Sequence, residues 1–434
     1  MSCKKFLDTK SNQTLTTPST VADLQMLLDT WYSINQRDAN SPLISADEYY
    51  LTTEDWLTLE EYERNTFTWQ PANLFVPGTG NDWANNYNII YNANTVLQEI
   101  EKIKPVKQAE WNNAKGHALF LRGKSFFQLL TIFSPAYDEA TAANDLGICL
   151  RLSPDFNIPS VRSTVKQSFD QAINDLQQSI PLLPLKPIHP LRPSKAAAYG
   201  YLARAYLYMR QYEKAGLYAD SALAIQNTLI DYNSPVPGYF DPNTDFPFSR
   251  FNPEVIYSCG TGSPSSVYYG YTDTVLIKSY DENDWRRTLY FAGPQIGSFK
   301  GSYEGTEDLF DGIAADECFL IRAESLARAN KKEEALNDLN HLLLNRYKSG
   351  TFSPVTAITA TEALNIILME RRKELFLRGL RWQDIKRLNK EGANITLKRT
   401  VNSKEYSLPP NDFRYALPIP EDVIKITGIP QNPR

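Results

Sequence analysis

The sequence predicts a mainly helical protein in which tetratricopeptide-like helix pairs form a scaffold that carries an irregular, aromatic-rich loop lobe. Three observations predict this fold class. Residues 196–225 read as two helices that meet through small side chains, and residues 318–343 repeat the same spacing. Two long stretches without periodicity, 37–82 and 231–312, lie between the helical segments and are rich in aromatic residues.

The helix pair at 196–225 is the clearest unit. It reads AAAYGYLARAYLYMRQYEKAGLYADSALAI. Small side chains let two antiparallel helices approach closely, and larger ones fill the groove between them. The packing positions of a tetratricopeptide repeat are occupied by Leu202, Ala203, Tyr206, Ala215 and Ala222.

Three further segments have helical periodicity. The second copy, 318–343, has small and large residues at the same offsets, namely Ala323, Leu326, Ala335 and Leu342. A degenerate third pair is expected to join helix 116–132 to helix 165–180 across an insertion. An early helix at 83–100 has a stripe that predicts its buried face, formed by Tyr87, Ile90, Tyr91, Asn94 and Leu97.

The stretches 37–82 and 231–312 are rich in Pro, Gly, Asn, Asp and aromatic residues. Loops longer than about 15 residues inside a compact domain are usually functional or disordered, and the aromatic content argues against disorder. Nine of the 25 Tyr lie between Tyr232 and Tyr303. We therefore expect a lobe that packs on the scaffold and binds a ligand that stacks on aromatic rings, such as a sugar.

Composition excludes several functions. The formal net charge of −5 comes from 45 Lys and Arg against 50 Asp and Glu, and such a surface does not attract nucleic acid strongly. No stretch approaches the ~18 consecutive apolar residues of a membrane-spanning helix. Any membrane attachment is therefore expected to be covalent or through a partner.

Residues suited to metals or cofactors are scarce. The three histidines have no second ligand at metal-binding spacing, and they are His117, His189 and His341. The cysteines beyond the N-terminus are expected to be single buried thiols, and they are Cys149, Cys259 and Cys318. No phosphate-binding glycine loop or nucleophile elbow occurs. We expect no metal and no cofactor.

Catalysis is not expected either. Asp281 and Asp284 are a carboxylate pair that in principle suits glycoside hydrolysis. However, the run Asp-Glu-Asn-Asp at 281–284 is more typical of a solvated loop. A helical glycoside hydrolase stays an alternative at this point.

The first residues, Met-Ser-Cys-Lys-Lys-Phe-Leu-Asp, are typical of the cut end of a bacterial lipoprotein signal. On this interpretation Cys3 carries the lipid, and the polar run 9–17 is a tether between the membrane and the folded domain. The alternative is a chance cysteine near the N-terminus.

The segment 369–387, MERRKELFLRGLRWQDIKR, is a long and specific motif. It resembles the ERR-x-EL-x-x-x-G-x-R-W-x-D-x-x-R segment of the SusD/RagB family of Bacteroidetes outer-membrane lipoproteins. Further matches follow the same order along the chain and cover nearly all of it, from CKKFLD at the start to LPIP and PQNP in the tail. The motif itself is expected to be structural, with Glu374 and Arg378 paired along one helix that ends or kinks at Gly379.

The resemblance implies a single SusD-like domain over 1–434. It implies a helical scaffold at 83–230 and 313–390, an irregular ligand-side lobe at 20–82 and 231–312, and a C-terminal tail, 391–434, packed on the core. Such proteins are lipid-anchored at the cell surface of the outer membrane. They bind an oligomeric nutrient, often a glycan, and pass it to a SusC-like TonB-dependent transporter.

Sugar rings stack on aromatic side chains while their hydroxyls need polar partners. The candidate ligand contacts lie in the two irregular regions that correspond to the family's ligand site, and they are Trp69, Asn73, Phe75, Asn81, Asp82, Tyr268, Tyr269, Tyr271, Trp285 and Arg286. Trp285 is the best single candidate, because a large apolar ring within a charged run has little local reason to be buried. The alternatives are that Trp285 packs onto the core and that the protein is a tetratricopeptide scaffold that binds only protein.

Overall fold

The computed structural model describes residues 18–78 and 80–434. It confirms a mainly helical fold, with only short strands among the described residues. No helix in this part of the chain is both long and apolar enough to cross a membrane. Cys3 lies outside the described residues.

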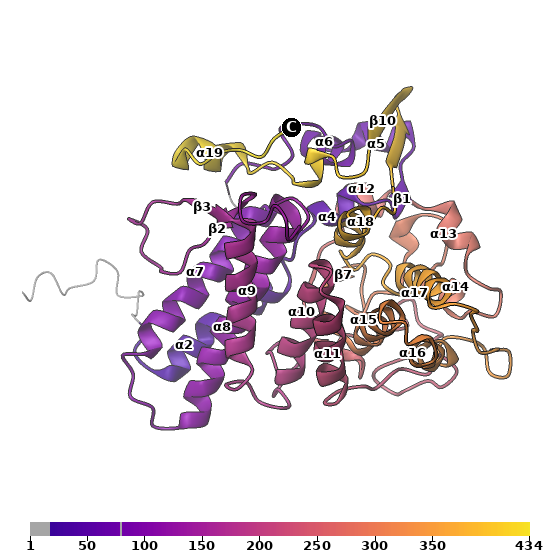
Figure 1. Cartoon of the computed structure of the whole chain (residues 1–434), viewed down its shortest axis with the longest axis horizontal. Helices are drawn as coiled ribbons and strands as arrows, with labels where there is room; N and C mark the ends of the chain where they lie inside the picture. The colour runs from indigo at the N-terminus through magenta and orange to yellow at the C-terminus, as the bar shows by residue number, and fades with distance from the viewer. Residues whose placement is uncertain (1–17, 79) are drawn as a thin grey trace, which may run out of the picture.

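The helices form a continuous array from the N-terminal half to the C-terminal half (Figure 1). Neighbours along the chain pack against each other, and α9 contacts α10 while α11 contacts α15. The members of the array are α7 (Asp82–Ile100), α8 (Gln108–Phe133), α9 (Val165–Ser179), α10 (Lys195–Tyr208), α11 (Tyr212–Leu223), α15 (Ala315–Arg328), α16 (Lys332–Leu344) and α17 (Ala360–Glu374). The predicted pairs α8–α9, α10–α11 and α15–α16 are therefore present.

Small residues produce the close helix contacts, as the sequence indicates. Ala203 on α10 and Ala215 on α11 are fully buried. A Cβ atom added at Gly216 of α11 would lie 2.9 Å from Cβ of Ser325 on α15. Only glycine allows this approach, so Gly216 fixes the spacing between the two tetratricopeptide-like units.

Helix α7 is present, but its predicted buried face was partly wrong. Ile90 and Asn94 are buried, whereas Tyr87 is half-buried and Tyr91 is exposed. The buried face also includes Ile89, Ala93 and Val96, so it is rotated relative to the predicted stripe. The two tyrosines instead line a cavity described below.

The N-terminal stretch is more helical than the sequence indicated. Its helices are short, and two of them begin at threonine N-caps whose side chains accept from otherwise free backbone N–H groups. They are α2 (Val21–Leu28), α3 (Trp31–Asn35), α4 (Ser41–Ser45), α5 (Thr53–Thr58) and α6 (Glu61–Phe67). Without long apolar periodicity, such short helices leave little trace in the sequence.

The middle of the chain contains short antiparallel strand pairs. Strand β1 (Tyr49–Tyr50) pairs with β6 (Tyr271–Thr272), so it joins the N-terminal stretch to the middle one. The other elements of this region are β4 (Val255–Tyr257), β5 (Gly260–Thr261), α12 (Ser265–Tyr268), α13 (Thr274–Lys278), α14 (Arg286–Leu289), η1 (Ile296–Ser298), β7 (Leu309–Phe310) and β8 (Ile313–Ala314). Buried aromatic side chains from this region form a separate apolar cluster.

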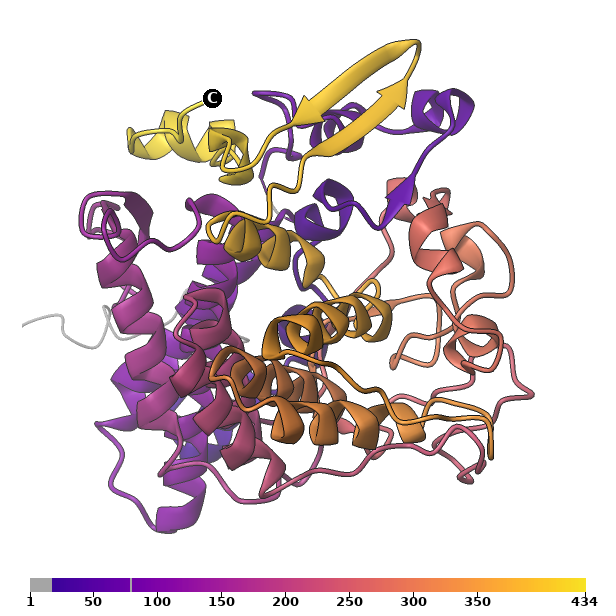
Figure 2. The same cartoon turned by 45° about the vertical axis from the view of Figure 1, so that its right-hand side comes forward.

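The C-terminal segment crosses one end of the helical array (Figures 1 and 2). It contains α18 (Arg381–Asn389), the hairpin β9 (Leu397–Val401) and β10 (Lys404–Leu408), η2 (Phe413–Tyr415) and α19 (Glu421–Thr427). The N–H of Leu417 donates to the carbonyl of Ile132, and the Asn432 amide donates to the carbonyl of Phe133. These bonds satisfy carbonyls at the end of α8. The insertion between α8 and α9 contains β2 (Leu146–Cys149) and β3 (Arg162–Thr164).

A buried ion cluster joins the middle segment to the second tetratricopeptide-like unit. Arg286 donates to Asp284, Glu370 and Glu374, at 2.7–2.8 Å for the shortest contact to each. Arg346 donates to Glu374 at 2.8 Å and to Glu254 at 2.9 Å. Both guanidinium groups are fully buried, so solvent does not weaken these contacts. We call these six residues the buried ion cluster.

The motif at 369–387 is structural, but two details of the prediction were wrong. Helix α17 ends at Glu374, before Gly379, and Leu377 and Gly379 both adopt positive φ. Glu374 pairs with Arg286 and Arg346, while Arg378 pairs with Asp316 at 2.8 Å. The helix ends before Arg378, so the two residues cannot pair along one helix.

Replacing Arg286 by Met should lower the free energy of unfolding by about 3–5 kcal/mol, because three buried carboxylates lose a partner. Arg287 is the matched control, because it is the next residue and its side chain is exposed. Arg287→Met should change stability by about 0.5 kcal/mol or less. Urea unfolding of both variants at pH 7 measures the difference. Equal stabilities would show that the cluster does not hold these segments together.

The buried carboxyl group of Glu48 makes the stability of the fold depend on pH. Its carboxylate accepts from the N–H of Leu377 at 2.9 Å, and its other oxygen is buried without a partner. Burial raises the pKa of Glu48 from 4.5 to about 7. Folded Glu48 thus keeps its proton where the unfolded chain has lost it, so its stabilising contribution is lost as pH rises through this window.

Glu48→Gln keeps the acceptor for Leu377 and removes the ionisation. At pH 8 the variant should exceed the natural protein in stability by on the order of 1–3 kcal/mol, and at pH 4.5 the two should be similar. Glu54→Gln, at an exposed position of α5, should leave the pH profile unchanged. Denaturant unfolding across pH 4.5–8 tests this, and parallel profiles for the natural protein and Glu48→Gln would refute it.

Candidate functional site

Two pairs of tyrosine rings lie on the segment 268–271 and on its partner strand β1, and they are here called the tyrosine surface: Tyr50, Tyr268, Tyr269 and Tyr271, of which Tyr271 is half-buried. Tyr50 is 46% exposed, Tyr268 43% and Tyr269 46%. The rings of Tyr50 and Tyr271 stack at 5.4 Å with an interplanar angle of 22°. The rings of Tyr268 and Tyr269 meet edge to face at 5.4 Å. Large rings that are exposed to solvent near one another are typical of a binding site.

Backbone pairing brings these residues together from segments far apart in sequence. Tyr50 of β1 lies opposite Tyr271 of β6, which places the two rings on one face of the strand pair. Gly270 allows the approach, because a Cβ atom there would lie 2.3 Å from the ring of Tyr49. Gln295 donates to the hydroxyl of Tyr271 at 3.1 Å and holds that ring in place.

The tyrosine surface offers both kinds of contact that a sugar needs. Ring faces stack on apolar C–H groups, and phenolic hydroxyls donate and accept hydrogen bonds. The hydroxyls of Tyr268 and Tyr269 make no hydrogen bond to any other described residue, so they are free to meet a ligand. Three of the ten predicted contacts, Tyr268, Tyr269 and Tyr271, belong to the tyrosine surface and stay predictions, and Tyr50 was not among the ten.

The predicted residues before α7 do not join this surface. Trp69 is buried with its indole N–H donating to the carbonyl of Ser45, and Arg399 lies 4.6 Å from its ring. Phe75 packs 5.6 Å from Phe133 in the core. For these two residues, ligand contact was wrong because the core and backbone already occupy their side chains.

The polar candidates of this segment also have structural partners. Asn81 is the N-cap of α7 and accepts from the N–H of Ala84. Asp82 is buried and accepts from the N–H groups of Asn40 and Ser41 at 3.0 Å. Asn73 is exposed, but its N–H donates to Glu421 at 2.8 Å, so it ties the segment to α19. Asn81 and Asp82 are therefore removed from the set of ligand contacts.

Trp285 and Arg286 are corrected as well. The indole N–H of Trp285 donates to Asn233 at 2.8 Å, and its half-buried ring packs on the aromatic cluster of the middle segment. Arg286 is fully buried in the ion cluster. The charged run 281–287 is typical of a solvated loop in sequence. In the structure, however, the carboxylate partners of Arg286 lie on α17. These contacts favour packing of Trp285 onto the core over contact with a ligand.

The pair Asp281 and Asp284 is unsuited to acid–base catalysis. Asp284 is buried, and although burial alone would raise its pKa, Arg286 holds the pKa below its ordinary value. Asp281 is exposed and accepts from the N–H of Asn283. The prediction of a solvated loop at 281–284 was thus wrong for Asp284, which is part of the buried ion cluster.

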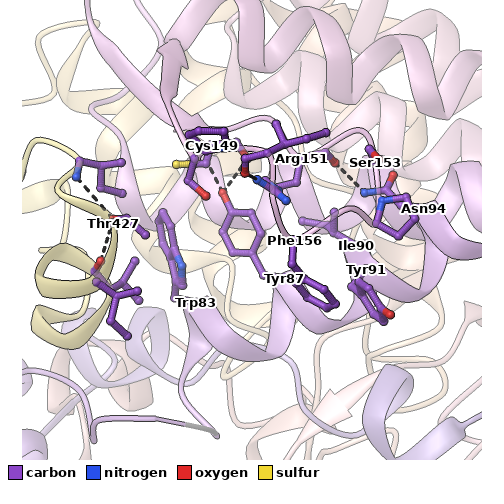
Figure 3. Close-up of a pocket in the computed structure, with 17 residues that line it drawn as sticks. Trp83, Tyr87, Ile90, Tyr91, Asn94, Cys149, Arg151, Ser153, Phe156 and Thr427 are labelled. Carbon is purple, nitrogen blue, oxygen red and sulfur yellow. Dashed lines mark hydrogen bonds between the residues drawn. The ribbon is translucent and has the colours of Figure 1, made fainter.

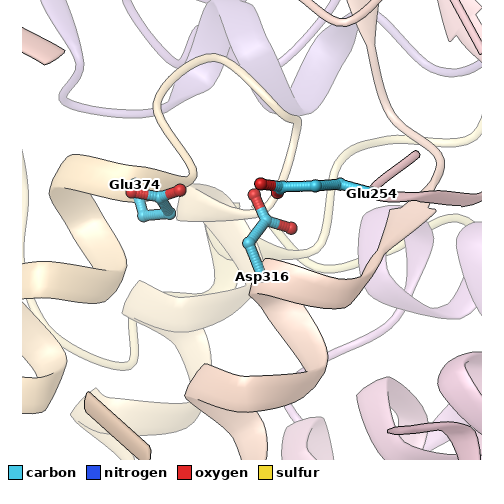
Figure 4. Close-up of side chains that lie close together, drawn as sticks. All are labelled: Glu254, Asp316 and Glu374. Atoms are coloured by element: carbon cyan, nitrogen blue, oxygen red, sulfur yellow. The ribbon is translucent and has the colours of Figure 1, made fainter. Parts of the chain in front are cut away.

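Glu254, Asp316 and Glu374 come close enough to share a metal ion (Figure 4). Their oxygens, however, already accept from arginines: Arg346 binds Glu254 and Glu374, and Arg378 binds Asp316. Burial also raises the pKa of Glu254 to about 7. A cation would have to displace these guanidinium groups, so the residues fit a structural junction and not a metal site.

A cavity of about 500 Å³ that the sequence did not predict lies beside α7 (Figure 3). Three segments surround it: the face of α7 with Trp83, Tyr87 and Tyr91, the loop 149–160, and α19 with the residues just after it. We call it the aromatic pocket. The signal was present as aromatic residues four apart, Trp83, Tyr87 and Tyr91, but it was interpreted as a core-facing stripe.

Comparisons with known proteins support one family. Residues 5–207 match a SusD-like family described as "Starch-binding associating with outer membrane", and residues 316–433 match the family described as "SusD family". SusD-like protein P2 of Formosa agariphila is 24% identical, over 86% of this chain and 83% of the relative.

Solved structures agree. A SusD superfamily protein of Bacteroides thetaiotaomicron has a TM-score of 0.75 at 22% identity, covering 96% of this chain and 100% of the other. A SusD-like carbohydrate binding protein of Bacteroides vulgatus has a TM-score of 0.67 at 20% identity, covering 95% and 97%. At these identities the likeness establishes the fold.

Proposed function

The chain belongs to the SusD/RagB family, and on that premise we propose that it binds an oligosaccharide at the cell surface and delivers it to a SusC-like TonB-dependent transporter. It acts as a binding protein without catalysis of its own. Its lipid anchor is Cys3, which keeps the domain at the outer membrane. Each part of this proposal has its own support.

The tyrosine surface is the observation that supports glycan binding. Its stacked and edge-on rings match sugar faces, and its free hydroxyls match sugar hydroxyls. The alternative of a scaffold that binds only protein requires the lobe's aromatic side chains to be buried. Tyr50, Tyr268 and Tyr269 are exposed, which favours the glycan.

The proposed transport and anchoring are supported by the family and by the Ser-Cys pair at residues 2–3. A binding protein alone cannot move a nutrient inward, so a channel partner is needed, and a tetratricopeptide-like array offers broad surfaces for such a partner. Several acyl chains on one cysteine give stable anchoring, whereas a single chain gives only marginal binding. The proposed glycan, transporter and anchor therefore form one functional unit.

Tyr50→Ala and Tyr269→Ala should each weaken oligosaccharide binding about tenfold, which corresponds to ~1.4 kcal/mol of lost stacking. Tyr239→Ala is the matched control, because Tyr239 is 45% exposed and lies outside the tyrosine surface. The ligand is first identified by affinity electrophoresis against a polysaccharide panel and then titrated by calorimetry. Equal affinities for all three variants would refute the site. Reducing ends released from the polysaccharides would instead indicate a hydrolase.

Cys3→Ala should release the protein from outer-membrane fractions of cells that lack the partner transporter. In cells that contain the transporter, mild detergent should co-purify the natural protein with a large β-barrel. Membrane retention of Cys3→Ala without the transporter would exclude Cys3 as the anchor. Recovery of the natural protein alone would count against the partner.

A further inference from the structure

The aromatic pocket has a wall of aromatic rings along one face of α7. Trp83, Tyr87 and Tyr91 follow each other at intervals of four residues, so they lie on neighbouring turns. Phe156 of the facing loop stacks on Tyr91 at 5.0 Å with an interplanar angle of 23°. Figure 3 shows these four rings, which all line the cavity. Its volume of about 500 Å³ is in the range of small-ligand sites.

Three polar groups of the pocket wall are free to bond to a ligand. The indole N–H of Trp83 and the hydroxyls of Tyr91 and Ser160 have no hydrogen-bond partner in the part of the chain that the structure describes. All three residues line the cavity. Trp83 is only 6% exposed, and a buried indole N–H normally has an acceptor. A ligand that carries hydroxyl groups can therefore pair with each of these groups.

Two other polar side chains of the wall fix its shape. The Tyr87 hydroxyl donates to the carbonyl of Cys149 at 2.8 Å and accepts from its N–H at 3.0 Å. The Asn94 amide donates to the carbonyl of Arg151 at 2.8 Å and accepts from Arg122 at 2.9 Å. These bonds join α7 to the start of the loop 149–160. The wall is therefore formed before a ligand arrives, which lowers the entropic cost of binding.

The lining of the pocket favours an uncharged ligand. Among the described residues, Arg151 is the one charged residue that lines the cavity. Its guanidinium already donates to the carbonyls of Asp155 and Ile158 in the same loop. No carboxylate of the described part of the chain lines the cavity. A sugar that carries carboxylate or sulfate groups would therefore find no free cation here.

Apolar side chains at the rim are open to solvent. Phe156 is 78% exposed, and Ile426 of α19 is 82% exposed. Exposed apolar groups beside a cavity are typical of a ligand site. Sugar C–H faces stack on such rings while sugar hydroxyls meet the polar groups between them. A purely apolar ligand would instead bury the three free polar groups without partners, which costs free energy.

We propose that the aromatic pocket is a second saccharide site, separate from the tyrosine surface, that binds a neutral oligosaccharide. Its sugar rings stack on Tyr91 and Phe156, and its hydroxyls accept from the Trp83 indole and bond to the Ser160 hydroxyl. This inference rests on the proposed function in that both sites take sugars. The two sites lie on different elements, and Figure 1 shows α7 and α19 towards the left and β1 towards the right.

Calorimetric titration of the full-length protein with cellotetraose, maltotetraose, laminaritetraose and xylotetraose tests the proposal. At least one of these neutral probes should still bind the double variant Tyr50→Ala/Tyr269→Ala, at one site per chain. Adding Phe156→Ser to that variant should weaken this binding about fivefold or more, because a stacking surface is lost. Trp83→Phe should weaken it too, because the ring stays and the N–H is removed. Phe413→Ser is the matched control, since Phe413 is 71% exposed and does not line this pocket.

The melting temperature of Phe156→Ser should stay unchanged, because the side chain is exposed. Absence of neutral-probe binding by the double variant, or equal binding with Phe156→Ser and Phe413→Ser, would overturn the proposal. If the natural protein still binds a probe in that case, the proposed function stands without this site. Binding that is lost with Phe156→Ser and kept by the double variant supports the pocket, whatever the tyrosine surface does. Tetragalacturonate is the anionic control, and its tighter binding to the double variant would refute a neutral ligand.

Discussion

The fold depends on one constraint: the charges of the buried ion cluster cannot be separated. Arg286 and Arg346 are fully buried, and between them they hold carboxylates from the middle segment and from α17. Ionised groups away from water are tolerated only when each has a partner. The irregular segment therefore has a single position on the helical array. Its strands are too short to specify that position by themselves.

This fixed position on the helical array explains how an irregular segment can display an ordered surface. Strands β1 and β6 contain two residues each, and their pairing alone is marginal. They are supported by the aromatic cluster beneath them, where Tyr49 packs 5.5 Å from Phe67. The ion cluster holds the other end of the same segment against α17. Loop residues carried on a rigid scaffold are a common arrangement for binding sites.

The sequence was informative where local pattern decides structure and uninformative where distant partners do. Ala203 and Ala215 predicted the helix pair because small residues at tetratricopeptide spacing leave few other packings. Trp285 and Arg286 were misassigned because their partners, Asn233 and Glu374, are far away in the chain. Tyr91 was placed in the core because periodicity cannot distinguish a core from a lined cavity. The aromatic composition of the middle stretch indicated Tyr268, Tyr269 and Tyr271. The pairing of Tyr50 with Tyr271 depends on the register of strands β1 and β6, which the sequence does not reveal.

The stacked rings of Tyr50 and Tyr271 also have a kinetic consequence. They lie on a strand pair of two residues each, so we expect local opening of this pairing to cost less free energy than opening of the long helices. A ligand that covers both rings would contact both strands and stabilise their pairing. Its binding would slow amide hydrogen exchange in β1 and β6 selectively, while exchange in α10 and α11 stays as it was. Ligand binding would thus be measurable as increased protection of a few backbone amides in this strand pair.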